Sequence, residues 1–244
     1  MSLENIPHLT TQAQTKYSPE EWAVRVDLAA AYRLVHDYGW TDMIYNHISA
    51  RVPGTEWHFL LNAYGLAYDE ITASSLVTVD LAGNVVHAPD PAYSINMAGY
   101  VIHRAVHEAR HSASCVIHTH PCRHGRGCFK VWPFAALPDR LVANLGDCDV
   151  MILRNHGLLT VGNTIAEAFN NMYRLERACQ VQLLAMACNT ELNIPSEQPV
   201  KNANVQLSVN NAAGFAGRAR PPFCIMEWPS LLRRLDKKDP SFRQ

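Results

Sequence analysis

The stretch Cys115-Val116-Ile117-His118-Thr119-His120 decides how the rest of the chain is interpreted. Apolar residues followed by polar ones are typical of a buried strand that reaches the end of a sheet. Because side chains two apart in a strand project from the same face, His118 and His120 are aimed at one point. Converging neutral imidazoles suit a divalent metal, although surface or hydrogen-bonded histidine pairs also have this spacing.

A second apolar run, residues 150–153, ends in the same manner at Arg154-Asn155-His156-Gly157. We predict that His156 stands at the end of a second strand and that Gly157 lets the chain turn closely past a site. Three histidines with an open position are the ligand set of a catalytic zinc site. The hypothesis from the two runs is a metal site formed by His118, His120 and His156.

Helices and strands alternate along the rest of the chain. A helix is predicted from the cap Ser18 to Gly39, because a proline and two acids stand in its first turn and apolar residues follow at spacings of three and four. Thr164 is predicted to cap a long helix that ends near Asn189. The alternation predicts an α/β layered fold. The remaining predicted elements are a helix over residues 95–110 and short strands over residues 48–52, 58–61, 76–79 and 84–86.

Three further histidines, His103, His107 and His111, are spaced four apart along the second predicted helix and at its end. A helical pair at this spacing can bind a metal, but a solvated helix face has the same pattern. We predict the solvated face.

The chain divides by composition into three parts. Residues 1–18 are polar and predict a flexible arm, and residues 19–190 hold the predicted domain. Residues 191–244 predict a linker rich in Pro, Asn and Gly, followed by a short amphipathic tail. The tail, Met226 to Leu235, has apolar positions that would dock on its own domain or on a neighbouring subunit.

Composition narrows the class of protein. The 244 residues carry a formal net charge of -1, which predicts neither a nucleic acid nor an anionic membrane as partner. No apolar run approaches the roughly 18 residues that span a bilayer, and the first residues lack the apolar core of a signal peptide. The seven cysteines show no paired pattern and predict reduced thiols, so we expect a cytoplasmic protein.

Four segments resemble the sequence motifs of class II aldolase/adducin proteins and occur in the same order: residues 39–51, 64–76, 116–120 and 152–159. The motifs YNHIS and ITASSLV are similar to those of the adducin-like bacterial branch of that family. The resemblance extends from about residue 20 to about residue 190.

The resemblance implies a three-layer α/β/α sandwich with a central mixed sheet, assembled as a homotetramer. It implies that His118, His120 and His156 bind Zn or another divalent metal. The metal would act as a Lewis acid on the carbonyl or enediolate oxygens of a small hydroxy-carbonyl or sugar-phosphate substrate, in a lyase or epimerase reaction. Asn46 and Gly65 stand at substrate-binding positions, although Asn46 is equally suited to close the corner between a helix and a strand.

Three departures from the family pattern concern catalysis. The position of the family's acidic base falls on Ala92, which has no ionisable group. The phosphate loop contains the bulky Tyr64 before Gly65. Segment 121–140 is shorter than the family's connection between the two metal strands, and its first part has neither helical nor strand periodicity. If residues 122–136 are translated in a shifted reading frame, and a deletion then restores the frame, the unusual sequence of this segment is explained.

These departures leave two alternatives to a metal-dependent enzyme. One is a non-catalytic assembly module like the adducin head domain, which serves beside actin in the cytoskeleton. The other is an inactive product of a frame-shifted, internally deleted gene. We expect lower stability than that of a full-length relative, because a missing segment exposes sheet edge and core surface.

Overall fold

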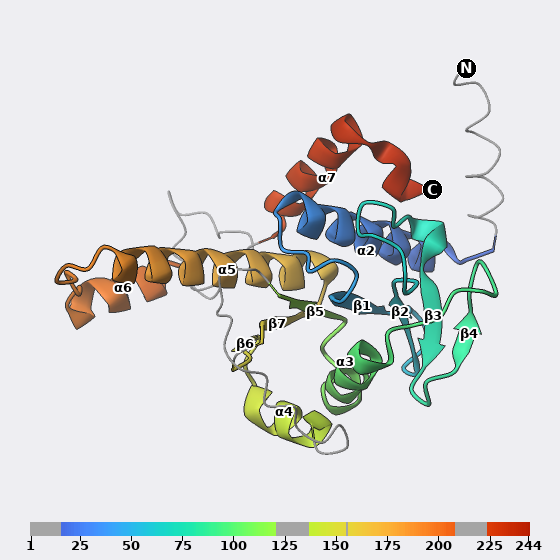
Figure 1. Cartoon of the computed structure of the whole chain (residues 1–244), viewed down its shortest axis with the longest axis horizontal. Helices are drawn as coiled ribbons and strands as arrows, with labels where there is room; N and C mark the ends of the chain where they lie inside the picture. Colours follow the sequence, from blue (N-terminus) through green and yellow to red (C-terminus); the bar gives the residue numbers. More distant parts are fainter. Residues whose placement is uncertain (1–15, 121–136, 155, 208–223) are drawn as a thin grey trace.

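The computed structural model describes residues 16–120, 137–154, 156–207 and 224–244 (Figure 1). Its centre is a seven-stranded sheet in the order β4-β3-β2-β1-β5-β7-β6. The four strands predicted before residue 90 are confirmed to within one residue at each end. The strands are β1 (His47–Arg51), β2 (His58–Leu61), β3 (Val77–Asp80), β4 (Val85–His87), β5 (Cys115–Thr119), β6 (Val150–Ile152) and β7 (Leu158–Gly162).

Every pairing between neighbouring strands is antiparallel in the described part of the chain. The prediction that the sheet is mixed, with parallel as well as antiparallel pairs, is therefore wrong for the described strands. The reason is that β1 to β4, and likewise β6 and β7, follow one another in space as in sequence, with no crossover helix between them. Neighbouring strands joined in this way run antiparallel.

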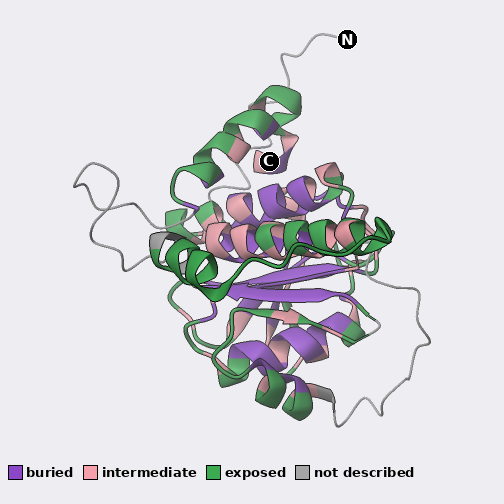
Figure 2. Cartoon of the chain, turned by 90° about the vertical axis from the view of Figure 1, so that its left-hand side faces the viewer, coloured by how far each residue is buried: buried purple, intermediate pink, exposed green. Residues whose placement is uncertain are grey.

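Helices cover both faces of the sheet (Figures 1 and 2). One face packs Ile117 and Leu158 into a core with α2, α5 and α7, and the opposite face packs Val116 and Leu159 against α3 and α4. Figure 2 shows the buried strands between these two layers, so the predicted α/β/α sandwich is confirmed. The helices are α2 (Pro19–Asp37), α3 (Met97–Ala109), α4 (Leu137–Leu145), α5 (Ile165–Ala187), α6 (Glu197–Leu207) and α7 (Glu227–Lys238).

Local capping groups fix where the long helices begin and end. The Ser18 hydroxyl accepts a hydrogen bond of 3.1 Å from the Glu21 amide at the start of α2. The Thr164 hydroxyl accepts one of 3.1 Å from the Glu167 amide at the start of α5. Gly39 follows α2 with a φ of 69°, a conformation that glycine adopts readily. Both predicted starts and the predicted end of α2 are confirmed.

The apolar run over residues 150–153 forms the short strand β6, but this strand is not buried. β6 ends at Ile152, and the Leu153 amide then donates to the Gly157 carbonyl at 2.8 Å before β7 begins. β7 lies beside β5, whereas β6 forms the sheet edge and leaves Ile152 59% exposed. His156 therefore lies in the hairpin turn after an exposed edge strand and not at the end of a buried strand, because an apolar run does not show which strand lies at the sheet edge.

The C-terminal part contains two helices. α6 lies within the segment predicted as a linker, and with the end of α5 it extends away from the sheet (Figure 1). α7 docks on its own domain, which is one of the two places predicted for the tail. Trp228 donates from Nε1 to Asp27 at 3.1 Å, and its ring contacts Phe169. The predicted N-terminal arm falls mostly on residues 1–15 and the atypical segment mostly on residues 121–136, which lie outside the described residues.

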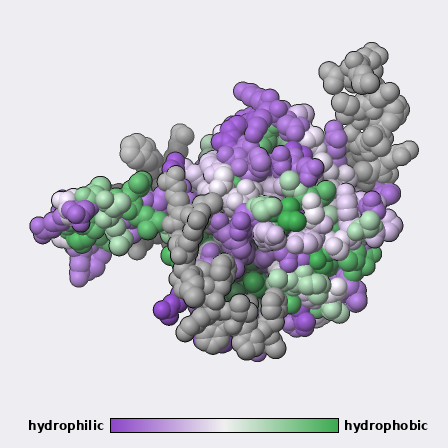
Figure 3. Space-filling model, viewed as in Figure 1, coloured by the Kyte–Doolittle hydropathy of each residue, from purple (hydrophilic) through white to green (hydrophobic). Residues whose placement is uncertain are grey.

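The projecting part of α5 and α6 exposes apolar side chains (Figure 3). We call it the α5–α6 extension. None of the described helices is long and apolar enough to cross a membrane. Exposed apolar patches of this kind mark contacts with other proteins. The exposed residues of the extension are Val181, Leu183, Leu184, Met186, Leu192, Ile194, Val200 and Val205.

Candidate metal centre

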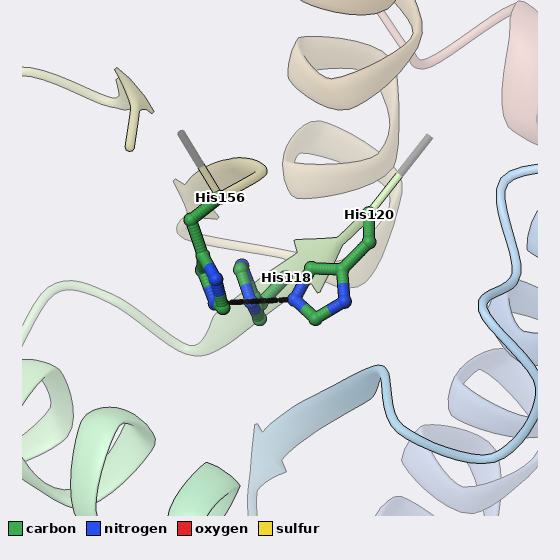
Figure 4. Close-up of side chains that lie close together, drawn as sticks. All are labelled: His118, His120 and His156. Atoms are coloured by element: carbon green, nitrogen blue, oxygen red, sulfur yellow. Dashed lines mark hydrogen bonds between the residues drawn. The ribbon is translucent and has the colours of Figure 1, made fainter. Parts of the chain in front are cut away.

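The three predicted histidines lie together at one end of β5 (Figure 4). His118 is buried in β5, His120 follows the strand, and His156 lies in the β6–β7 turn. The Nε2 atoms of His118 and His120 are 2.8 Å apart, and Nε2 of His156 is 3.1 Å from each of them. The antiparallel pairing of β5 with β7 is what brings the distant His156 back to the other two.

The other ring nitrogen is already committed in two of the three rings. His118 donates from Nδ1 to the Leu158 carbonyl at 2.8 Å, and His120 donates from Nδ1 to the Asp42 carboxylate at 3.1 Å. A neutral imidazole that donates at one nitrogen has only a lone pair at the other. Nε2 of the buried His118 is therefore an acceptor, and Nε2 of His120 is one whenever that ring carries a single hydrogen; outer partners of this kind orient metal-binding histidines.

Burial keeps two of the rings uncharged. Desolvation lowers the pKa of His118 well below its ordinary value, and neighbouring imidazoles lower it further. Desolvation, followed by the effect of His120, lowers the pKa of His156 to about 4. Since neutral imidazole is the form that binds a metal, no proton competes at these two nitrogens at neutral pH.

The distances between the nitrogens fit a divalent metal. Zinc bound tetrahedrally at roughly 2.0–2.1 Å would separate its nitrogen ligands by about 3.3 Å. The three Nε2 atoms are 2.8 to 3.1 Å apart, so small shifts would admit an ion. Three protein ligands leave a fourth position for a small molecule, as in catalytic zinc sites. Within the described ranges, these three side chains form the cluster that could hold an ion.

Gly157 brings the β6–β7 turn against the end of β5. A Cβ at this position would lie 2.2 Å from the Thr119 carbonyl oxygen and 2.8 Å from Cδ2 of His120. Neither distance is tolerable, so only glycine permits this approach. The prediction that Gly157 lets the chain pass closely by the site is confirmed.

Comparison with known proteins gives the family. The family model described as Class II Aldolase and Adducin N-terminal domain matches residues 26–124 and 129–183. The chain belongs to this family. A Pseudomonas aeruginosa protein that is provisionally named a class 2 aldolase is 42% identical over 264 residues, which cover 97% of this chain and 98% of the relative. Mouse alpha-adducin is 34% identical over 250 residues, which cover 90% of this chain and 34% of the adducin.

Two solved structures share the fold of this aldolase/adducin chain. An aldolase II superfamily protein from Pseudomonas syringae is 40% identical, with a TM-score of 0.84 over 96% of this chain and 100% of that protein. L-fuculose 1-phosphate aldolase from Glaciozyma antarctica is 26% identical, with a TM-score of 0.74 over 92% of this chain and 93% of the enzyme. The fold expected from the sequence resemblance is thus the fold of the family.

The Pseudomonas aeruginosa relative also bears on the short connection between the metal strands. The match extends over 264 residues and this chain has 244, so at least 20 residues of the relative have no counterpart here. These gaps lie inside the matched region. Gaps of this size are compatible with the short segment 121–140, and the frame-shift hypothesis stays a prediction.

Asn46 meets one of its two predicted roles and leaves the other open. Its Oδ1 atom accepts a hydrogen bond of 2.5 Å from the Asp42 amide, which closes the corner between α2 and β1. The side chain is fully buried, and its Nδ2 group has no partner in the described part of the chain. A buried amide hydrogen without an acceptor costs free energy, so a ligand oxygen at this point would stabilise the site.

The other family positions lie in loops. Gly65 follows β2 with a φ of 113°, and none of the contacts of the described residues joins it to the triad. Ala92 is exposed in the loop before α3. The carboxylate that contacts the triad belongs to Asp42 instead. Sequence analysis does not identify Asp42, because nothing in the pattern around it indicates that the loop folds back toward β5.

Sequence analysis also misses a buried polar cluster beside the triad. His47 and Ser49 of β1 and His103 and His107 of α3 are each at most 4% exposed. The predicted solvated face is therefore wrong for His103 and His107, and only His111 is exposed. A spacing of four shows that side chains share a helix face but not where that face points. The alternation of His47 and Ser49, which places both on one face of a strand, was the available signal.

Proposed function

We propose that this aldolase/adducin family member binds zinc or another divalent metal through His118, His120 and His156 and takes a small hydroxy-carbonyl or sugar-phosphate substrate. When bound, the metal supplies a Lewis acid for the carbonyl and enediolate oxygens of the substrate. The reaction class is that of a lyase or an epimerase.

The convergence of three Nε2 atoms is the observation that supports this proposal. The Leu158 carbonyl and the Asp42 carboxylate hold the Nδ1 hydrogens of His118 and His120, so these rings have no hydrogen left to share at Nε2. Lone pairs at 2.8 Å repel each other unless an ion or a proton lies between them. Low pKa values of His118 and His156 disfavour a proton on either of these rings, and a metal ion would bind the lone pairs of all three.

Zinc titration of the metal-free full chain, followed by calorimetry and metal analysis, tests the site. We expect one ion per chain, no binding by His118→Ala, and no binding by His156→Ala, whose exposed side chain can be removed without harm to the core. The exposed His111→Ala is the matched control and should bind zinc as the wild type does. Wild-type protein that binds no zinc, or zinc binding that survives both triad substitutions, would refute the proposal.

A substrate rich in oxygen atoms is supported by Asn46 and by the relatives. The buried Nδ2 group of Asn46 lacks an acceptor, and one structural relative is named L-fuculose 1-phosphate aldolase. Gly65 stays a predicted substrate-binding residue. A screen of hydroxy-aldehydes and sugar phosphates with zinc-loaded protein should find a substrate whose KM rises in Asn46→Ala. The exposed amide of Asn84 offers the matched control, Asn84→Ala, which should leave the KM unchanged.

An adducin-like assembly module is the second candidate function. It is favoured by the likeness to alpha-adducin and by Ala92 at the position of the family's acidic base. Sedimentation with actin filaments tests this role. Metal-free protein that sediments with filaments, together with no turnover in the substrate screen, would favour assembly over catalysis, and the reverse pair of results would exclude it.

A homo-oligomer, a tetramer by resemblance, is part of the same proposal. The apolar side chains of the α5–α6 extension are available for contact with another copy, since Ile194 is 74% exposed and Val181 is 65% exposed. Sedimentation velocity should give a single defined oligomer. The cytoplasmic location and the reduced state of the cysteines stay predictions, with the five described cysteines all unpaired.

A further inference from the structure

A chain of hydrogen bonds runs from the side of the triad into the protein interior. Nδ1 of His47 is 2.7 Å from Nε2 of His103, and Nδ1 of His103 is 2.5 Å from the hydroxyl of Ser49. The same hydroxyl is 2.7 Å from Nε2 of His107. The chain ends at the Ala113 carbonyl oxygen, 3.1 Å from Nδ1 of His107. These contacts join β1 to α3 through side chains that are buried.

The Ala113 carbonyl fixes the direction of every bond in this chain. Because a carbonyl only accepts, His107 donates from Nδ1 and, as a neutral ring, accepts at Nε2. The Ser49 hydroxyl must then donate to His107, and it accepts from Nδ1 of His103. His103 in turn accepts at Nε2 from Nδ1 of His47. The Nε2 atom of His47 is left as a lone pair.

Neutral rings are what make this direction unique. Burial lowers the pKa of His107 to about 3, with a further lowering by the nearby Arg51. Burial also lowers the pKa of His103 well below its ordinary value. His47 is 4% exposed and bonds to the His103 ring, and none of its described hydrogen-bond partners is a carboxylate that would stabilise a charged ring. A neutral ring carries one ring hydrogen, so the reverse direction would set the lone pair of His107 Nδ1 against the lone pairs of a carbonyl.

The ring of His47 lies next to the triad. His47 pairs with His118 across β1 and β5, and their ring centres are 5.0 Å apart. The Cδ2–Nε2 edge of the ring packs against Gly99 in the first turn of α3, where a Cβ would lie 2.6 Å from Nε2. Within the described residues, Nε2 of His47 has no hydrogen-bond partner.

We propose that His103, Ser49 and His107 are positioning residues that hold His47 as a hydrogen-bond acceptor beside the triad, so that the site selects a ligand with a hydroxyl group at this point. A site built to bond a hydroxyl discriminates against analogues that lack it, because its acceptor then has no partner in the complex. The selection of a ligand rests on the proposed metal site, whereas the position of the ring hydrogens does not.

Two-bond 1H–15N spectra of the metal-free full chain, labelled with 15N-histidine, report which ring nitrogen carries the hydrogen. We expect His47 to carry it at Nδ1 at pH 7.5. Ser49→Ala removes the acceptor of His103 Nδ1, so we expect His103 to carry its hydrogen on Nε2 instead. His103 then donates to Nδ1 of His47, and His47 must carry its own hydrogen on Nε2. Ser49→Thr keeps a hydroxyl and should restore the wild-type pattern. Thr160→Val, which removes a buried hydroxyl that is not part of these hydrogen bonds, should leave the 15N signals of His47 unchanged.

A wild-type His47 with its hydrogen on Nε2 overturns the proposal, and so does an unchanged His47 signal in folded Ser49→Ala. If Ser49→Ala does not fold, the wild-type spectrum decides alone. The ring signals that disappear in His47→Gln are assigned to His47, so the measurement is specific to this ring.

Glycolate and acetate, which differ by one hydroxyl group, test the selection. Zinc-loaded wild type should bind glycolate on the order of tenfold more tightly than acetate through this hydrogen bond, and Ser49→Ala should lose that part of the preference. A preference that persists undiminished in Ser49→Ala overturns the selection. Failure to bind zinc at all would contradict the proposed function, while the ring-hydrogen measurement would still decide whether His47 is the acceptor.

Discussion

Acid should destabilise this protein through His107. The pKa of an exposed histidine in the unfolded chain is about 6.5, and burial in the fold lowers the pKa of His107 to about 3. Below pH 6.5, His107 therefore binds a proton in the unfolded chain but stays unprotonated in the folded protein. The stabilising contribution of neutral His107 is complete above pH 6.5 and is lost as the pH falls toward 3.

The size of this effect follows from the pKa difference. Each pH unit between the two pKa values costs about 1.4 kcal/mol, so His107 alone lowers the free energy of unfolding by about 2 kcal/mol between pH 6.5 and pH 5. His103 is lowered in the same direction and adds to the loss. Because domains of this kind are stable by only about 5–15 kcal/mol, a loss of about 2 kcal/mol is a measurable part of the whole.

Urea unfolding of the metal-free chain, followed by tryptophan fluorescence from pH 7.5 to pH 5, measures the effect. His107→Gln removes the titrating group while keeping polar atoms, and its stability should fall by about 2 kcal/mol less than that of the wild type over this range. His111→Gln, at an exposed position of the same region, should fall as the wild type does. Equal losses in His107→Gln and wild type would refute the reasoning, because His107 would then be charged or hydrated in the fold.

Three substitutions test the packing that positions the site. Gly99→Ala places a Cβ 2.2 Å from Cδ2 of His47, and urea unfolding should show a loss of about 1–3 kcal/mol with a displaced His47 signal in the 15N spectrum. Gly157→Ala places one 2.8 Å from Cδ2 of His120, so calorimetry should show zinc affinity lower by on the order of tenfold or more. Trp228→Ala removes a side chain that is 7% exposed and bonded to α2, and should cost about 3 kcal/mol in urea unfolding.

The elements that sequence predicts well are those with signals of their own. Ser18 and Thr164 cap helices through bonds to amides three residues on, and such bonds need no partner from elsewhere in the chain. His118 and His120 share a strand face by geometry alone. For these residues the local pattern and the three-dimensional position coincide, so the beginnings of α2 and α5 and two members of the triad follow from the sequence.

The elements that sequence misses depend on partners far along the chain. The apolar run at residues 150–153 becomes the edge strand β6 because β7, which follows it in the chain, takes the place beside β5. The His103–His107 face of α3 points inward because β1 offers Ser49 and His47 as hydrogen-bond partners. Neither fact is contained in the period of the segment itself, since periodicity identifies a face and not its neighbour.

The charges at the triad bear on whether the chain catalyses a reaction or only binds. Removing a proton from carbon requires a base within hydrogen-bond reach, and the Asp42 carboxylate is already bonded to Nδ1 of His120. Ala92 supplies no replacement. Three neutral imidazoles would leave the full charge of a divalent ion uncompensated by its protein ligands, which favours an anionic or polarised oxygen in the fourth position. The buried Nδ2 group of Asn46 also lacks an acceptor among the described residues, so an oxygen-rich ligand suits both the ion and this side chain.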